Sequence, residues 1–571
     1  MTSTVAEIVV DTLVAAGAKR CWGIVGDTIN HFTDAVRRSP LVWHNVRHEE
    51  AGALAAGGEA YMTGELAVCA GTTGPGSLHF ANGIFEAHRN GAPVVLIASN
   101  VDRPQVGLHF PQEVDQRRIY EQASVFCEAI SHPSQARRIT ALAAQAALTR
   151  HGVAVILVNG DVFLESDADD LPWSVHRPNS VTIPTEAELD ALAGLIARAR
   201  RITLYAGYGA RAAHGEVVAL AEALQAPVVH TTRAKEFIEP DNRFNVGMTG
   251  ILGNRAGMDA IEGCDLLLCL GTDFAWTQYY PQQAKIAQLD IDPAHIGRRS
   301  PVDLGLVGDV GPTIAALLPR LAGERDEVHL AAALEQWDKD RAAYAKAGEE
   351  SDPELIHPQF VAQKLDRLAA PDAIFTADGG SPQVWCLRHV AAGGGRRFLI
   401  SLLHGTMANA YPSAMGIAAA YPDRQVIAMC GDGGMTMLMG DLLTLKQEGF
   451  AVKLLVFDNG SLGFVEMEQR VEGLLDSYTS LENPDFAALA RCCGLFGEQV
   501  CQAGDLEAAM QRWLAHDGPA LLSVKVNRFE LVMPPKVEAG QVASTALFGV
   551  KAVLDGRARE VVSLLRDNFI R

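Results

Sequence analysis

Short apolar runs recur along the whole chain, and segments with helical spacing separate them. A run that is apolar at every position is typical of a parallel strand buried on both faces. Because such runs alternate with helical segments, the pattern predicts βαβ units and an α/β fold of doubly wound parallel sheets. We expect strands at Cys21–Val25, Val42–Val46, Leu66–Ala70, Val94–Ala98, Val153–Val158, Ile202–Tyr205, Leu266–Leu270, Ile286–Ile291, Ile374–Thr376, Val426–Cys430, Leu454–Asp458 and Leu521–Val526.

Two polar, proline-bearing stretches interrupt this alternation, at Glu165–Glu186 and Glu324–Pro358. Such stretches are typical of domain boundaries. A chain of 571 residues is also too long for a single hydrophobic core. We therefore predict three α/β domains, residues 1–180, 181–345 and 346–530, followed by an amphipathic helical tail, residues 531–571.

Both ends of the chain show helical spacing of apolar residues. Residues 1–20 lack a basic start before their apolar part, so they do not resemble a signal peptide. In the tail, Leu547, Val550 and Leu554 recur at helical spacing, and arginines lie beside a second apolar stripe in residues 561–570. That pattern fits a helix lying in a membrane interface, or a helix docked on its own protein.

Composition narrows the possible partners. The formal net charge of −20 disfavours nucleic acid, whose binding depends on phosphate contacts with Lys and Arg. No apolar run approaches the roughly 18–20 residues that span a bilayer. The ten cysteines are scattered without a CxxC pair, so we expect neither a zinc site nor a disulfide framework, and reduced thiols suit the cytoplasm.

The most informative motifs follow two successive predicted strands in the last third of the chain. Gly431-Asp432-Gly433-Gly434 follows the first, and Asn459-Gly460-Ser461 follows the second. Asp432 and Asn459 offer hard oxygen atoms that suit Mg²⁺ together with the phosphate oxygens of a ligand. The simpler alternative is that Asp432 only caps the next helix.

This pair of motifs resembles the cofactor-metal motif of the thiamine-diphosphate enzymes, in which GDG is followed at this distance by Asn. The resemblance implies thiamine diphosphate and Mg²⁺ as cofactors. It implies that Asp432 and Asn459 bind the metal through their side chains and Ser461 through its carbonyl. The cofactor would also contact Gly433, Gly434, Gly460, Leu462 and Gly463.

Two further segments resemble the pyruvate oxidase and acetolactate synthase branch of that family. Arg47-His48-Glu49 follows a predicted strand, and the resemblance implies that Glu49 hydrogen-bonds the aminopyrimidine ring, with Glu50 structural. In Gly405-Thr406-Met407 it implies that the Gly405 carbonyl accepts the aminopyrimidine amine and that Met407 bends the cofactor. Without the resemblance, Glu49 is also compatible with a surface helix start, and Met407 with a core position.

The turn Gly74-Pro75-Gly76 lies at the active site in that family, and His79 follows it in this chain. A buried position for His79 in the hydrophobic core is the alternative.

The middle third carries glycines and acidic residues at strand ends, which suit a pyrophosphate and ribose hydroxyls. No GxGxxG fingerprint is present, so ordinary turns are the alternative. The resemblance implies FAD at Gly250, Ile251, Leu252, Gly253, Asp273, Phe274, Asp290, Ile291 and Asp309.

Over its whole length the chain resembles the bacterial quinone-dependent pyruvate oxidoreductases of this family. The resemblance implies oxidative decarboxylation of pyruvate to acetate and CO₂ through hydroxyethyl-thiamine diphosphate, with electrons passed through FAD to ubiquinone. It implies a homotetramer, held at a phospholipid membrane surface on the inner face of the cell membrane by the tail. Phe464 matches an aromatic linked to electron transfer, and Gln112 belongs to an active-site loop.

The sequence departs from the family pattern at one place, and three alternative functions stay open. Relatives often carry Phe-Gln where this chain has Pro111-Gln112, which leaves the preference among 2-oxo acids open. The rivals are a carboligase of acetolactate synthase type, a pyruvate oxidase that uses oxygen and phosphate, and a catalytically silent member of the family.

Overall fold

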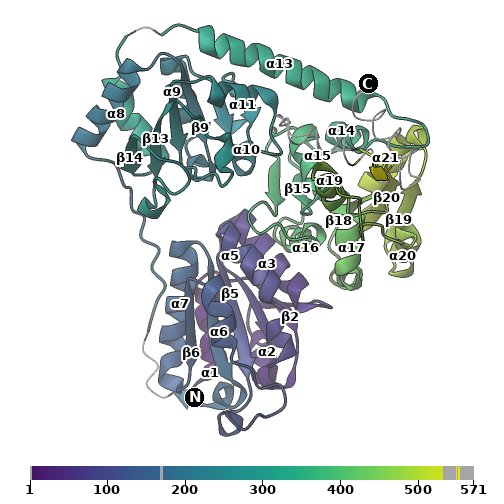
Figure 1. The fold of residues 1–571 in the computed structure, drawn as a ribbon. Helices are drawn as coiled ribbons and strands as arrows, with labels where there is room; N and C mark the ends of the chain where they lie inside the picture. The colour runs from purple at the N-terminus through teal and green to yellow at the C-terminus, as the bar shows by residue number, and fades with distance from the viewer. Residues whose placement is uncertain (1–2, 168–171, 324, 531–547, 549–550, 553–571) are drawn as a thin grey trace.

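Three parallel six-stranded sheets form three lobes of the molecule (Figure 1). The structure, a computed structural model, describes residues 3–167, 172–323, 325–530, 548 and 551–552. The predicted fold class is confirmed, because each sheet is parallel throughout and has helices on both faces. The predicted tail lies outside the described residues apart from Phe548, Lys551 and Ala552.

The first lobe has strand order β3-β2-β4-β5-β7-β6. Helices α1 and α7 pack on one face of this sheet, and α3 and α5 on the other. A short antiparallel pair, β1 (Ser3–Thr4) and β8 (Ser166–Asp167), joins the two ends of the lobe. Its elements are β2 (Arg20–Ile24), β3 (Val42–Asn45), β4 (Ala67–Gly71), β5 (Val94–Asn100), β6 (Phe126–Ile130), β7 (Val153–Asn159), α1 (Val5–Ala15), α2 (Asn30–Arg37), α3 (Glu49–Thr63), α4 (Pro75–Leu78), α5 (Ala81–Asn90), α6 (Gln116–Tyr120) and α7 (Ala136–Arg150).

The second lobe has strand order β11-β10-β9-β12-β13-β14. A long helix, α13 (Val328–Glu349), crosses from this lobe to the third one (Figure 1). The predicted boundary at residue 345 therefore falls inside a helix. The other elements are β9 (Ile202–Ala206), β10 (Val228–His230), β11 (Asn245–Met248), β12 (Leu266–Leu270), β13 (Lys285–Asp290), β14 (Leu304–Val307), α8 (Glu186–Arg198), α9 (His214–Leu224), α10 (Lys235–Ile238), α11 (Arg255–Glu262) and α12 (Val310–Leu317).

The third lobe has strand order β16-β15-β17-β18-β20-β19. Helices α14, α15 and α21 pack on one face of its sheet, and α16, α18 and α20 on the other. Its elements are β15 (Ile374–Ala377), β16 (Arg397–Ile400), β17 (Val426–Gly431), β18 (Val452–Asp458), β19 (Phe496–Val500), β20 (Ala520–Lys525), α14 (Pro358–Leu368), α15 (Ser381–His389), α16 (Ala410–Ala420), α17 (Asp432–Met437), α18 (Leu442–Glu448), α19 (Gly463–Val471), α20 (Phe486–Cys492) and α21 (Leu506–Ala515).

The first and third lobes share one hydrophobic core, because α3 packs directly against α16. Glycines allow the two helices to approach closely. A Cβ atom at Gly416 would lie 1.8 Å from the Ala55 carbonyl oxygen, and one at Gly58 would lie 2.5 Å from the Ser413 carbonyl oxygen. The two lobes that carry the predicted thiamine-cofactor residues are thus held together by backbone contact.

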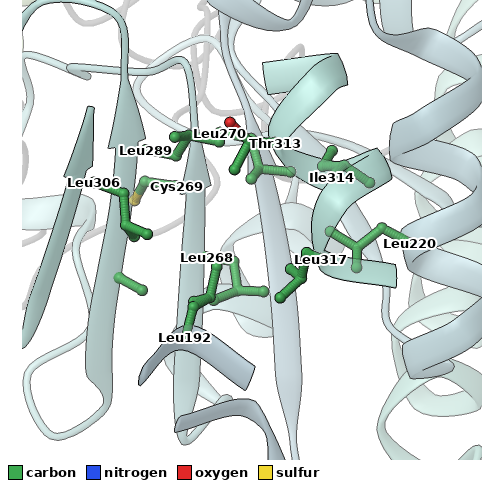
Figure 2. Close-up of a pocket in the computed structure, with 11 residues that line it drawn as sticks. Leu192, Leu220, Leu268, Cys269, Leu270, Leu289, Leu306, Thr313, Ile314 and Leu317 are labelled. Carbon is green, nitrogen blue, oxygen red and sulfur yellow. The ribbon is translucent and has the colours of Figure 1, made fainter. Parts of the chain in front are cut away.

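A small cavity lies in the second lobe, between the sheet and α8, α9 and α12 (Figure 2). Its lining side chains include Leu192, Leu220, Leu268 and Ile314. Its volume of about 10 Å³ is room for at most one water, and its lining is almost wholly apolar. It contains none of the predicted site residues. Within the described residues no helix is both long enough and apolar enough to cross a membrane.

Candidate active site

Neighbouring strands β17 and β18 bring the two predicted metal-binding motifs together. Their parallel register pairs Gly431 with Phe457, so both strands end at the same edge of the third sheet. Asp432 begins α17 directly after β17, and Asn459 directly follows β18. The side-by-side arrangement follows from the crossover between two adjacent parallel strands.

Asp432 is almost fully buried, and its carboxylate accepts three hydrogen bonds. Its Oδ1 accepts from the Gly433 amide at 2.8 Å, and its Oδ2 accepts from the Gly460 amide at 2.7 Å. The Asn483 side-chain amide also donates to Oδ2, at 2.8 Å. Burial raises the pKa of Asp432 despite these bonds. A cation beside this carboxylate would favour its charged form.

The loop after β18 presents oxygen atoms near Asp432. Asn459 Oδ1 accepts the Ser461 amide at 3.0 Å, and the Ser461 carbonyl accepts the Gly463 amide at 2.9 Å. The Ser461 hydroxyl donates to the buried Glu466 carboxylate. In the described part of the chain no group of three His, Cys, Asp or Glu side chains is placed to bind a metal. A metal here would need one carboxylate with amide and carbonyl oxygens.

A pocket of about 250 Å³ opens at this edge of the third sheet. Glycines give it room: a Cβ atom at Gly433 would lie 2.9 Å from Leu462 and 3.1 Å from Met407. Of the residues in the third lobe that were predicted to contact thiamine diphosphate or its metal, Thr406 and Gly460 do not line it. The predicted residues that do are Gly405, Met407, Asp432, Gly433, Gly434, Asn459, Ser461, Leu462, Gly463 and Phe464.

The first lobe holds the loop that carries Gly405 and Met407. Asn82 on α5 donates to the Thr406 hydroxyl at 2.8 Å and to Glu50 at 2.6 Å. His404 Nε2 lies 2.9 Å from Asn82 Oδ1. Glu50 therefore contacts the pocket loop through Asn82.

Glu49 and Gln112 both lie beside the Gly74–Gly76 turn in the first lobe. Glu49 begins α3, is buried, and faces His79 Nδ1 at 2.9 Å. A Cβ atom at Gly76 would lie 3.4 Å from Glu49 Oε1, and one at Gly74 would lie 2.8 Å from Gln112 Cβ. His79 is half exposed and stacks on His48, so it is not a core histidine. Neither Glu49 nor Gln112 lines the pocket of the same chain.

Known proteins match all three lobes. Residues 3–119, 189–317 and 378–524 match the N-terminal TPP-binding, central and C-terminal TPP-binding domains of thiamine pyrophosphate enzymes. The putative thiamine pyrophosphate-containing protein YdaP of Bacillus subtilis is 33% identical over 99% of this chain and 98% of its own length. The chain belongs to the thiamine pyrophosphate enzyme family.

Relatives in this family differ in their reactions. The large subunit of acetolactate synthase isozyme 2 from Escherichia coli is 30% identical over 93% of this chain and 96% of its own length. A pyruvate oxidase from Lactiplantibacillus plantarum is 29% identical over 81% of this chain and 78% of its own length. The comparisons therefore establish a thiamine pyrophosphate enzyme without separating these two reactions.

The pocket of this thiamine pyrophosphate enzyme fits a diphosphate with Mg²⁺. Asp432, Asn459 and Ser461 carry hard oxygen atoms of the kind that Mg²⁺ prefers, and they would not need to form a full protein cage because phosphate oxygens would complete the shell. A Cβ atom at Gly434 would lie 2.3 Å from Asp378 Oδ2, so the wall at this point is bare backbone. Met407 and Phe464 supply apolar surface.

Asp378 is a pocket residue that the sequence motifs did not single out. It follows β15, is buried, and accepts the Ala410 amide at 2.8 Å and the Gly431 amide at 3.1 Å. Burial raises the pKa of Asp378 to about 7. Its carboxyl group thus ties the first residue of α16 to the last residue of β17. The available signal was an aspartate at a predicted strand end, like Asp432.

The predicted flavin residues of this thiamine pyrophosphate enzyme lie at the carboxyl ends of strands in the second sheet. Gly250 has φ +96°, and a Cβ atom there would lie 2.6 Å from the Phe274 ring, so the turn after β11 packs against the turn after β12. Asp273 forms ion pairs with Arg298 and Arg299.

The other predicted flavin residues follow β13 and β14. Asp290 Oδ1 lies 3.1 Å from His295 Nδ1, and the next residue, Ile291, is exposed. Asp309 Oδ2 accepts the Thr182 amide at 2.8 Å, so this carboxylate already holds the segment that enters the lobe. The glycine turn and the acidic strand ends suit a dinucleotide at this edge of the sheet.

Proposed function

We propose that the protein is a pyruvate:ubiquinone oxidoreductase that uses thiamine diphosphate, Mg²⁺ and FAD. The overall reaction is pyruvate + H₂O + ubiquinone → acetate + CO₂ + ubiquinol. When CO₂ departs, the electron pair of the broken bond stays on the substrate carbon, and these two electrons would then pass through FAD and reduce the quinone. The family and the pocket support the thiamine chemistry, and the oxidative half rests on the argument below.

One observation carries the oxidative half of the proposal. Trp385 and Phe464 line the pocket in the third lobe. Trp385 belongs to an apolar cluster that includes Met248, and Phe464 and Leu252 both pack against this cluster. Met248 ends β11, and Leu252 lies in the predicted flavin turn. One apolar cluster therefore contacts both the lining of the thiamine pocket and the predicted flavin turn. That proximity suits electron transfer between two cofactors.

When bound, thiamine diphosphate supplies a carbon nucleophile and an electron sink, chemistry that protein side chains lack. The chain supplies binding, orientation and proton handling. Asp432, Asn459 and Ser461 hold the metal and diphosphate, and Met407 shapes the cofactor. Glu49 holds a proton at the aminopyrimidine ring, and His79 keeps that carboxylate oriented through the contact of 2.9 Å.

A complete site in this proposal takes residues from two chains. Glu49 and Gln112 lie in the first lobe, away from the lining of the pocket in the same chain. Glu49 of one chain beside Asp432 of another requires at least a dimer, and we propose a homotetramer. We also propose that the enzyme is cytoplasmic and meets ubiquinone at the phospholipid surface of the inner face of the cell membrane, through the predicted tail.

A carboligase of acetolactate synthase type is the second candidate, and the identity of 30% to the E. coli synthase favours it. A pyruvate oxidase that uses oxygen and phosphate is the third, in view of the L. plantarum relative. The experiment that separates them is an anaerobic spectrum of the purified protein with thiamine diphosphate and Mg²⁺, before and after pyruvate is added.

We expect the flavin band to bleach, because electrons from pyruvate reach FAD. Oxidation of the bleached enzyme by a ubiquinone analogue, faster than by oxygen and independent of phosphate, would separate the quinone enzyme from the oxidase. A flavin band that persists while CO₂ is released would favour the carboligase, and a protein without flavin would contradict the oxidative proposal.

A further inference from the structure

Helix α15 connects the thiamine pocket to the predicted flavin turn. At its beginning, Ser381, Pro382 and Trp385 line the pocket. Near its end, Arg388 reaches the second lobe. A helix of nine residues is about 13 Å long and is stiff along its axis. The same element therefore contacts both predicted cofactor sites.

Arg388 binds the backbone of the predicted flavin turn through two separate donors. Its Nε donates to the Leu252 carbonyl at 3.2 Å, and one Nη donates to the Gly253 carbonyl, also at 3.2 Å. The guanidinium lies 5.9 Å from the centre of the Tyr344 ring on α13. Burial lowers the pKa of Arg388. A fork of this kind fixes both the position and the orientation of the turn.

The turn itself has little freedom to adjust. Gly253 donates its amide to the Gly250 carbonyl at 3.0 Å, and a Cβ atom at Gly253 would lie 2.6 Å from the Met248 carbonyl oxygen. The turn is thus tightly folded, and a shift of the two carbonyls that Arg388 holds would move the turn as a whole. Leu252 would move with it, away from the apolar cluster that contains Trp385.

We propose that Arg388 is a positioning residue that sets the spacing between the thiamine cofactor and the flavin, with α15 as the rigid spacer. This inference rests on the proposed function, because it requires a flavin at the turn. Arg388 acts through the backbone of residues 252 and 253 and touches neither substrate nor the reacting atoms. A misplacement of about 1 Å can slow a reaction about a hundredfold, so a loosened turn should slow flavin reduction more than it weakens binding.

The test compares three variants of the full-length protein loaded with thiamine diphosphate, Mg²⁺ and FAD. Arg388→Met removes both donors and keeps an apolar stem, and Arg388→Lys keeps the charge without the fork. Arg424→Met is the matched control, since Arg424 also donates to two carbonyls, of Asp372 and Gly395, but both lie in its own lobe. The measurements are the amount of bound flavin per chain, the thiamine diphosphate affinity by calorimetry and the flavin circular dichroism band. The rate of anaerobic flavin reduction at saturating pyruvate is measured as well.

We expect Arg388→Met to slow flavin reduction by about tenfold or more and to change the flavin dichroism band, with thiamine diphosphate affinity unchanged. Arg388→Lys should lie between Arg388→Met and the wild type, and it carries the test if Arg388→Met does not fold. Arg424→Met should reduce its flavin at the wild-type rate. Equal reduction rates in the wild type and both Arg388 variants would overturn the inference while leaving the proposed function intact. A wild-type protein without flavin would overturn both.

Discussion

Two buried aspartates beside the pocket, Asp432 and Asp378, have different electrostatic surroundings. Asp432 accepts two backbone amides and the Asn483 side-chain amide, and it faces the loop with the other predicted metal ligands. Asp378 has backbone amide partners, and burial raises its pKa to about 7. The first is suited to hold a cation, and the second to hold two backbone segments in place.

Replacing Asp432 with Ala should weaken the binding of Mg²⁺ and thiamine diphosphate by about a hundredfold or more, because a direct ligand matters at least as much as its supporting contacts. Calorimetric titration measures this. Asp441→Ala is the matched control, since Asp441 is also buried but binds the Arg47 amide and Thr444, outside the pocket. Asp441→Ala should lower the free energy of unfolding and leave the affinity for Mg²⁺ and thiamine diphosphate unchanged. Unchanged cofactor binding in Asp432→Ala would refute the metal assignment.

Replacing Glu49 with Gln should reduce turnover by about a hundredfold or more while fold and cofactor binding are kept, because the amide cannot exchange the proton. Glu50→Gln is the control: its remaining oxygen can still accept from Asn82, so most of the turnover should persist. Turnover with pyruvate and a soluble dye acceptor is the measurement. Full activity in Glu49→Gln would exclude the catalytic role, and a wild type without any turnover would favour a silent family member.

The raised pKa of Asp378 makes a prediction about stability and pH. An aspartate in an unfolded chain has a pKa of about 3.9, below the folded value of about 7. Its stabilising contribution is therefore complete below about pH 4 and is lost as pH rises through 7. Relative to Asp378→Asn, the cofactor-free wild type should lose up to about 3 kcal/mol of unfolding free energy between pH 5 and 8. Urea denaturation of both proteins at pH 5 and pH 8 measures this difference. Equal losses of unfolding free energy in the wild type and in Asp378→Asn would contradict the prediction.

At the scale of elements, the strands that the sequence predicted and the strands it missed differ in position. The predicted runs Val426–Cys430 and Leu454–Asp458 became β17 and β18 in the centre of their sheet, where both faces are buried. Apart from the short β1 and β8, the strands that were not predicted are β6, β10, β11, β14, β16 and β19. All of these except β10 are edge strands, whereas β3 is the one edge strand of the three large sheets that was predicted. An edge strand such as β19, Phe-Gly-Glu-Gln-Val, mixes polar and apolar residues and lacks a continuous apolar run.

The candidate site shows the same division. Asp432 and Asn459 could be paired from sequence because adjacent parallel strands bring their ends together. The contacts of Asp432 with Asn483 and of Asn82 with Thr406 could not, because loops and helices distant in sequence supply them. Motifs at strand ends are thus readable from sequence, and the groups that hold them in place require the folded chain.

The contact between α3 and α16 makes a prediction at the same scale. Gly416→Ala should cost about 3 kcal/mol of stability, because the new methyl group would overlap the Ala55 carbonyl and push the helices apart. Gly194→Ala in α8 is the control: its Cβ atom would meet only Arg198 at 3.6 Å, and it should stabilise the helix by roughly 0.5–1 kcal/mol. Thermal unfolding compares the two, and equal melting temperatures would contradict the close contact.

At the scale of the whole molecule, the described residues of the predicted tail contact the third lobe. Phe548 is buried beside Leu475, and the Arg470 guanidinium lies 5.4 Å from its ring centre. Lys551 donates to the Gly473 carbonyl at 2.8 Å. Arg470 is also paired with Glu466, which accepts the Ser461 hydroxyl. Within the predicted tail, Phe548 and Lys551 thus contact the third lobe.

Deleting residues 547–571 should spare turnover with a soluble acceptor and abolish stimulation by phospholipid vesicles. The net charge of −20 makes attraction to anionic lipid weak, so burial of the predicted apolar stripes should dominate binding. A second truncation, of residues 553–571, keeps the contacts of Phe548 and Lys551 and should behave alike. Vesicle flotation measures binding, and equal flotation of the full and truncated chains would contradict the role of the tail.

Helix α13 also limits how the length of this chain can vary. Surface loops tolerate insertions at little cost, but α13 packs on α11 in the second lobe and on α14 in the third. Each residue added to a helix advances it by 1.5 Å and turns it by about 100°. A single insertion or deletion within Val328–Glu349 would therefore swing one lobe around the other and carry the turn at Gly250–Gly253 away from Arg388. Among homologues of this protein, the length of α13 should therefore be conserved as strictly as the residues of the pocket.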